Sequence, residues 1–270
     1  MSPAPSPASK GPWLLLGSFA LLAFLFSGAL AAVQPATGID SEALTLPQFG
    51  PALAALTTWL IWRGRVAALL PAAVSRKQVI AHTVLMVAAV ALFAAIATAF
   101  ALATGQGMEG VAAVAGTPFV AFLALQLIGA TGEEIGWRGF MQPLLETRMG
   151  RFAAASATGV VWAAWHIDIF TAGLAVASAF FVSTVAFAVL LGYMGNGSFW
   201  QRVATASIGH WLINIALHIV AGERVNESPQ VYFTALAAVV TTAVFLAMFV
   251  RARAARQRAR ERDTGESSAD

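Results

Sequence analysis

Residues 78–104 read QVIAHTVLMVAAVALFAAIATAFALAT, a run without a single acidic residue, lysine or arginine. A helix that crosses a bilayer needs about 20 mostly apolar residues, and this run exceeds that length. Seven further apolar runs satisfy or approach the same requirement, at residues 13–33, 47–62, 111–135, 152–171, 173–194, 202–221 and 231–250. The sequence therefore predicts an all-α polytopic membrane protein with about eight transmembrane helices.

The composition excludes the soluble classes. Of the 270 residues, 59% are hydrophobic and 11% are charged, and the mean hydropathy is +0.74. A soluble domain cannot bury so much apolar surface behind so few charges. The chain has no cysteine, which excludes disulfides and thiolate chemistry. The net charge of +3 does not indicate a nucleic-acid partner, because the basic residues lie between apolar runs and in one tail. The expected surroundings are the lipid bilayer, and the alanine-rich, cysteine-free composition favours a bacterial inner (cytoplasmic) membrane.

The distribution of charge predicts the orientation. Cationic residues prefer the cytoplasmic side of a membrane. With the N-terminus inside, all the basic loops fall inside and only Arg224 falls outside. The opposite loops carry the acidic residues Asp40, Glu42, Glu109, Glu223 and Glu227. This asymmetry predicts an even number of spans, with both termini cytoplasmic.

Three segments are expected along the chain. Residues 1–12 are rich in proline, serine and alanine and are predicted to be disordered. Residues 13–250 form a single transmembrane helical domain, whose candidate site residues lie within 131–214. Residues 251–270 form a basic and then acidic cytoplasmic tail. Ala29-Leu-Ala31 is compatible with signal-peptidase cleavage; the first run is long for a signal sequence, which favours an uncleaved helix.

The candidate site begins with the stretch 132–140, GEEIGWRGF. Glu134 and Arg138 are four residues apart and share a helix face, whereas Glu133 is rotated by about 100°. This spacing predicts an ion pair between Glu134 and Arg138, which leaves Glu133 without a local partner and directed at a cavity. Such a carboxyl suits a general base or acid. The alternative is that both glutamates line the cytoplasmic interface as a solvated helix end.

Two later runs carry the remaining polar candidates. Trp162 and His166 are one helical turn apart, so the indole can pack on the imidazole. His210 and Asn214 also share a face. Functionally, the histidines can carry protons or bind a ligand, and Asn214 can donate to a developing oxyanion. The alternatives are a core histidine bonded to a backbone carbonyl and polar contacts that hold helices together. The functional interpretation assumes that the three runs converge.

These residues resemble a known family. Glu133-Glu134-xxx-Arg138, then Trp162-xxx-His166, then His210-xxx-Asn214 is similar to the three ordered motifs of the CAAX protease and bacteriocin-processing (CPBP, or Abi) family of intramembrane endopeptidases, which are related to the CAAX prenyl endopeptidase. One departure is Trp162, where the family usually has phenylalanine, and we expect this change to affect local packing only.

The resemblance implies an intramembrane endopeptidase that acts on membrane-associated polypeptides, with its site in a polar cavity open toward the cytoplasm. It implies that Glu133 activates water with the help of His166. His210 and Asn214 would stabilise the oxyanion, and the Glu134–Arg138 pair would hold the first glutamate in place.

The cofactor stays open at this point. Glu133, His166 and His210 offer one carboxylate and two imidazoles, which is a ligand set compatible with Zn²⁺. Metal-assisted and metal-free hydrolysis are both consistent with the motifs, and no organic cofactor is expected. Two other functions also remain: a non-catalytic membrane immunity or scaffold protein, and a proton-coupled transporter.

Overall fold

The computed structural model describes residues 12–111 and 113–266, and the described chain is built from helices. The first half contains α1 (Trp13–Thr37), η1 (Leu46–Phe49), α2 (Gly50–Ile61), α3 (Arg63–Leu69), α4 (Arg76–Ala103) and α5 (Phe119–Glu134). The second half contains η2 (Ile135–Met141), α6 (Gln142–Glu146), α7 (Arg151–Trp165), η3 (Ile167–Ala172), α8 (Leu174–Met194), α9 (Phe199–Ala221), η4 (Gly222–Asn226) and α10 (Gln230–Glu266). The all-α fold class is confirmed for this part of the chain.

Within the described residues, six helices are long and apolar enough to cross a membrane. They are Trp13–Thr37, Arg76–Ala103, Phe119–Glu146, Leu174–Met194, Phe199–Asn226 and Gln230–Ala252. The other two predicted spans correspond to α2 and α7, which have 12 and 15 residues and fall short of about 20. The chain thus has the architecture of an integral multi-pass membrane protein. The count of eight and the cytoplasmic termini stay predictions.

The predicted fourth span, 111–135, is shifted along the chain. The helix begins only at Phe119, after Pro118, and residues 113–118 form a loop in which Gly116 adopts a positive φ of 77°. At the other end the helix does not stop at the acid pair but continues through the seven-residue π-helix η2 into α6. The charges predicted to end the span are instead buried within it, because they pair with one another.

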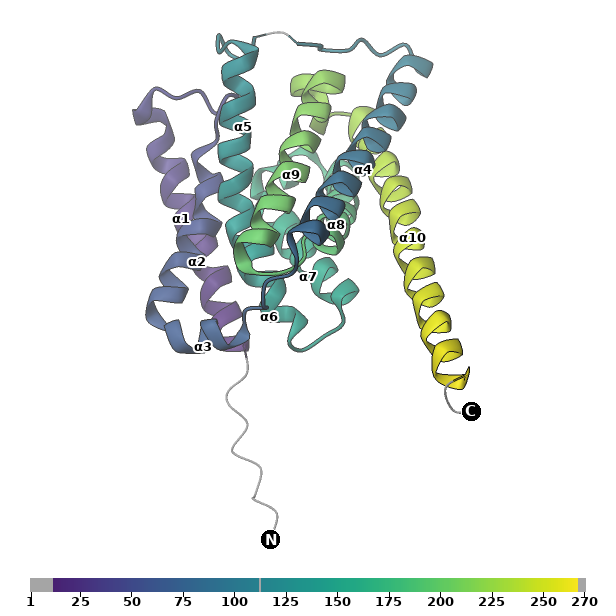
Figure 1. Ribbon diagram of the computed structural model, residues 1–270. Helices are drawn as coiled ribbons and strands as arrows, with labels where there is room; N and C mark the ends of the chain where they lie inside the picture. The colour runs from purple at the N-terminus through teal and green to yellow at the C-terminus, as the bar shows by residue number, and fades with distance from the viewer. Residues whose placement is uncertain (1–11, 112, 267–270) are drawn as a thin grey trace.

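The helices form a bundle in which neighbours along the chain frequently pack together. α1 packs on α2, α7 on α8, and α10 on both α8 and α4. α9 lies against α4 and α5, near the middle of the bundle (Figure 1). The start of α1 and the end of α10 lie at the same lower end, and η4 lies at the upper end (Figure 1). The two ends of the described chain thus lie at the same end of the bundle, and the placement of the termini relative to a membrane stays a prediction.

The predictions for the two ends of the chain, residues 1–12 and 251–270, can be compared with the structure only over the described residues. Of the predicted disordered segment 1–12, residues 1–11 lie outside the described residues. At the other end α10 runs on to Glu266, so most of the predicted tail 251–270 continues the last helix. Residues 267–270 lie outside the described part of the chain.

Candidate active site

The acid pair lies in the interior of the bundle. Glu133 and Glu134 are 2% and 0% exposed, and Arg138 is 1% exposed. Glu134 is the last residue of α5, and Arg138 lies four residues later in the π-helix η2, which continues α5. The interpretation as a solvated helix end at the cytoplasmic interface is therefore wrong.

Glu134 joins two of the predicted motifs. Its Oε1 lies 2.8 Å from Nη1 of Arg138 and 2.9 Å from Nδ1 of His210 on α9. The predicted Glu134–Arg138 ion pair is confirmed, and its contact with His210 is an addition that the spacing did not indicate. Because an ionised carboxylate only accepts hydrogen bonds, His210 must donate from Nδ1, which leaves its Nε2 for other partners.

Glu133 is not without a partner, contrary to the prediction. Its Oε2 accepts a 2.6 Å hydrogen bond from Nε1 of Trp162, and its Oε1 accepts a 3.0 Å bond from Nε2 of Gln48. Trp162 therefore does more than provide local packing, since a phenylalanine ring has no N–H to donate. The same indole lies 4.3 Å beneath the guanidinium of Arg138, so Trp162 contacts the first acid and the cation of the second.

Gln48 is a site residue that the sequence analysis missed. It lies on the short 3-10 helix η1, which approaches α5 closely at Gly132. A Cβ at Gly132 would lie 2.9 Å from the carbonyl oxygen of Gln48, so only glycine permits this approach without a shift. Gly132, next to the acid pair, was the signal in the sequence for this contact, because a glycine can mark a close backbone approach. It does not identify the segment that approaches.

His166 is oriented by its own helix. It follows the last residue of α7, and its Nδ1 lies 3.0 Å from the carbonyl oxygen of Trp162. A carbonyl cannot donate, so Nδ1 carries the hydrogen and Nε2 is the open nitrogen. The imidazole packs edge-on against Trp165 at 4.8 Å and Phe180 at 5.0 Å. Trp162 is farther, at 6.2 Å, so its carbonyl rather than its ring provides the main contact.

Asn214 lies one helical turn beyond His210 on α9, as predicted. Its Nδ2 donates a 3.2 Å hydrogen bond to Oε1 of Gln126 on α5, whose own Nε2 reaches the carbonyl of Ala43 at 3.3 Å. Gln126 is a second residue that the sequence analysis missed. The Asn214 amide is thus oriented from the opposite helix, as expected both for interhelical contact and for a positioned donor.

The two histidines and the asparagine share one cavity of about 200 Å³, bounded by α7, α8, α9, η4 and the start of α10. His166, His210 and Asn214 therefore converge on one cavity, whereas Glu133, which was assumed to face the same cavity, does not line it. Trp162 forms part of the same wall. Glu133 lies behind this wall and is joined to it through the indole N–H.

The direction of this cavity differs from the implied one. Its far wall includes Val225 and Asn226 of η4, at the upper end of the bundle in Figure 1, opposite the start of α1 and the end of α10. If both termini are cytoplasmic, the cavity extends toward the non-cytoplasmic side, whereas the resemblance implies a cavity open toward the cytoplasm.

The residues do not form a metal site in this arrangement. Among the described residues, no three His, Asp or Glu side chains are grouped so that they could hold an ion. Nδ1 of each histidine contacts a protein oxygen, and Nε2 is left for other partners. Glu133 does not line the cavity that holds both histidines, so the conditional Zn²⁺ ligand set of Glu133, His166 and His210 is not assembled in this arrangement, and the use of a metal stays a prediction.

Two comparisons with known proteins bear on this site. The family described as Rce1-like, type II CAAX prenyl endopeptidase Rce1-like, matches residues 115–216, which include all three motifs. A relative named CAAX prenyl protease 2, from Methanococcus maripaludis, is 28% identical over 141 residues. That alignment covers 48% of this chain and 51% of the relative, so the chain spans about half the length of the relative it matches. On these matches, residues 115–216 are similar to the type II CAAX prenyl endopeptidases of the Rce1-like family.

Proposed function

We propose that this chain is an intramembrane endopeptidase of the CAAX-protease type, which hydrolyses peptide bonds of membrane-associated polypeptides. The observation that carries the proposal is the cavity lined by His166, His210 and Asn214, with the buried Glu133 bonded to its wall through Trp162. Buried ionisable groups inside a helical membrane bundle are costly and mark functional sites. The family match over residues 115–216 supports proteolysis as that function.

Water activation is the role of Glu133 and His166. Each carboxylate oxygen has two lone-pair positions, so the hydrogen bonds from Trp162 and Gln48 leave Glu133 able to accept from water. Neutral His166 offers Nε2 as a proton acceptor, because Nδ1 is bound to a carbonyl. In this scheme the water oxygen attacks the peptide carbonyl carbon while one of its protons passes to these groups. The C–N bond of the tetrahedral intermediate then breaks, and that proton is delivered to the departing amine.

His210 and Asn214 stabilise the developing oxyanion. The Asn214 amide carries two hydrogens, and Gln126 uses one of them, so the second can donate to the oxyanion. A protonated His210 donates from Nε2 while Glu134 holds Nδ1. The Glu134–Arg138 pair thereby orients His210 and not Glu133 directly. Preorganised donors of this kind lower the barrier because they need no reorganisation during the reaction.

The test is cleavage by the purified full chain in lipid nanodiscs, on peptides with and without a prenylated C-terminal cysteine. We expect Glu133→Gln to lower the rate by about 100-fold or more, the range for losing a general base, with expression and melting temperature unchanged. Cleavage at the wild-type rate by this variant would refute the assignment. A chelator and Zn²⁺ add-back, run in parallel, separate the metal-free scheme proposed here from a metal-assisted one.

A further inference from the structure

A second cavity lies at the opposite end of the bundle from the first. It has a volume of about 610 Å³ and lies between the first turns of α4, the end of α8 and the second half of α10. We call it the basal cavity. It shares no lining residue with the cavity of His166 and His210. It therefore needs an explanation separate from peptide hydrolysis.

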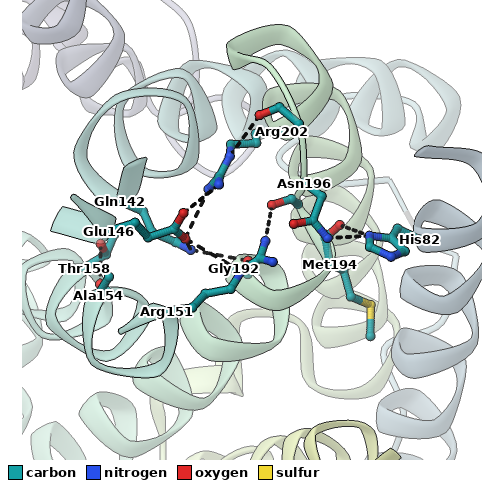
Figure 2. A network of polar contacts seen from close by, with 12 residues as sticks. His82, Gln142, Glu146, Arg151, Ala154, Thr158, Gly192, Met194, Asn196 and Arg202 are labelled. Atoms are coloured by element: carbon teal, nitrogen blue, oxygen red, sulfur yellow. Dashed lines mark hydrogen bonds and ion pairs between the residues drawn. The ribbon is translucent and has the colours of Figure 1, made fainter. Parts of the chain in front are cut away.

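One wall of the basal cavity is polar and rests on a partly buried network of charges (Figure 2). Arg151, which lines the cavity, donates to the carbonyls of Gly192 and Gly195 at 3.0 and 2.7 Å. Its Nε also lies 3.7 Å from Glu146, which binds Arg202 at 2.6 Å. Two guanidinium groups thus share one carboxylate.

The rim of the same wall adds Lys77, which lines the cavity together with Arg151. Lys77 is exposed at the start of α4, beside Ser75 and Gln78, and all three line the cavity. Farther in, Nδ1 of His82 lies 2.7 Å from Nδ2 of Asn196. Among the described side chains, none that lines this cavity is acidic. The polar wall therefore suits an anion that also accepts hydrogen bonds.

The facing wall is apolar. α10 contributes Phe245, Met248 and Phe249, and α4 contributes Leu85. Phe249 packs against the rings of His82 and Tyr193 at 6.0 and 6.1 Å, so the apolar and polar walls meet directly. A small soluble anion would leave this apolar wall without a contact. An amphiphile with an anionic head and hydrocarbon chains would contact both walls.

We propose that the basal cavity binds one anionic phospholipid, with its phosphate near Lys77 and Arg151 and its acyl chains against α10. The cavity lies at the end of the bundle that the charge distribution predicts to be cytoplasmic, where bilayers expose anionic lipids that attract lysine and arginine. Because α4, α8 and α10 all line it, the bound lipid stabilises the packing of α10 on the bundle.

The experiment measures retention of phosphatidylglycerol by the full chain in native mass spectrometry and by titration in detergent, with phosphatidylcholine as the neutral reference. The wild type should prefer phosphatidylglycerol and melt at a higher temperature in its presence, because a ligand that binds the folded state stabilises it. Lys77→Gln should weaken binding roughly fivefold, the effect of one lysine near a lipid headgroup. Ala81→Trp keeps every charge and places a bulky side chain in the cavity, so it should abolish the preference.

The matched control is Arg65→Gln, which removes an exposed cation near the same end of the bundle but outside the cavity. It should bind phosphatidylglycerol as the wild type does. An equal loss in Arg65→Gln and Lys77→Gln would mean general surface attraction and would overturn the proposal. Stabilisation by inorganic phosphate alone, or undiminished binding by Ala81→Trp, would also overturn it. None of these outcomes depends on peptide cleavage.

Discussion

The indole N–H of Trp162 donates a 2.6 Å hydrogen bond to Oε2 of Glu133, and the carbonyl of the same residue lies 3.0 Å from Nδ1 of His166. One residue of α7 thus holds both groups proposed to activate water, the acid through its side chain and the base through its backbone. A change confined to the side chain should therefore affect the acid and leave the base in position.

Trp162→Phe tests this arrangement. Phenylalanine keeps an aromatic ring beneath Arg138 but removes the donor to Glu133. A hydrogen bond to a charged group contributes about 1.5–3 kcal/mol, so we expect kcat to fall at least tenfold while KM changes little. Peptide cleavage kinetics provide the measurement.

The matched control is Trp165→Phe. Its indole N–H donates to the hydroxyl of Ser27 at 2.8 Å and not to an acid, and its ring packs against His166. This variant should retain cleavage activity. If the two variants had the same kcat, positioning of Glu133 by Trp162 would be wrong.

Glu134→Gln should act mainly through stability. It leaves the buried Arg138 without its anion, and breaking a buried pair typically costs about 3–5 kcal/mol. We expect a lower melting temperature and, because His210 loses its acceptor, a lower rate. The double variant Glu134→Gln/Arg138→Met should recover much of the stability but not the rate. A wild-type melting temperature for the single variant would contradict the pairing.

Asn214→Ala should lower kcat by roughly 100-fold or more with little effect on KM, the range for loss of an oxyanion donor. Gln126→Ala provides the comparison, since it removes only the acceptor that orients Asn214. It should have an intermediate rate. Equal and small effects in both variants would indicate that Asn214 only holds α9 to α5.

A pH effect is expected at the upper end of the bundle, where Glu42 interacts with Glu223 of η4. The negative charge of Glu223 raises the pKa of the Glu42 carboxyl, with smaller contributions from desolvation and Asp40. A raised pKa in the folded state means that stability is present at acid pH and is lost as pH rises through that pKa. Glu42→Gln should therefore raise the melting temperature slightly at pH 7, by about 1 °C, because exposed charges contribute little.

Thermal unfolding at pH 7 and pH 3 measures this difference, which should vanish at pH 3, because that pH lies well below both the ordinary and the raised pKa of Glu42. High salt should also remove it. Glu227→Gln, which removes another exposed acid at this end, is the control for the loss of one negative charge. A Glu42 variant that is less stable than the wild type at pH 7 would contradict the repulsion.

The sequence predicted contacts that lie within one helix. The Glu134–Arg138 pair follows from the four-residue spacing, and the shared face of His210 and Asn214 follows from the same geometry. Apolar runs also placed the main helices, because hydropathy depends on composition and length. The predicted end of the span at Ile135 was wrong, because the sequence alone does not distinguish charged residues that pair inside a bundle from charged residues at its surface.

Contacts between distant segments could not be predicted from spacing. The donor Gln48 is separated from Glu133 by 85 residues, and Gln126 from Asn214 by 88. Neither glutamine lies in one of the motifs or at a helical spacing from its partner. The role of Trp162 was missed for another reason, since its aromatic ring was considered and its N–H was not.

The contact between η1 and α5 at Gly132 also limits how this protein can be divided. Residues 115–216 contain every motif residue, yet the amide that secures the first glutamate comes from residue 48, far upstream. A fragment that begins near residue 115 would keep every motif residue but would lose Gln48, which donates a hydrogen bond to the proposed base Glu133. Chimeras that exchange this core among relatives should therefore carry the upstream hairpin of α1, η1 and α2 with it.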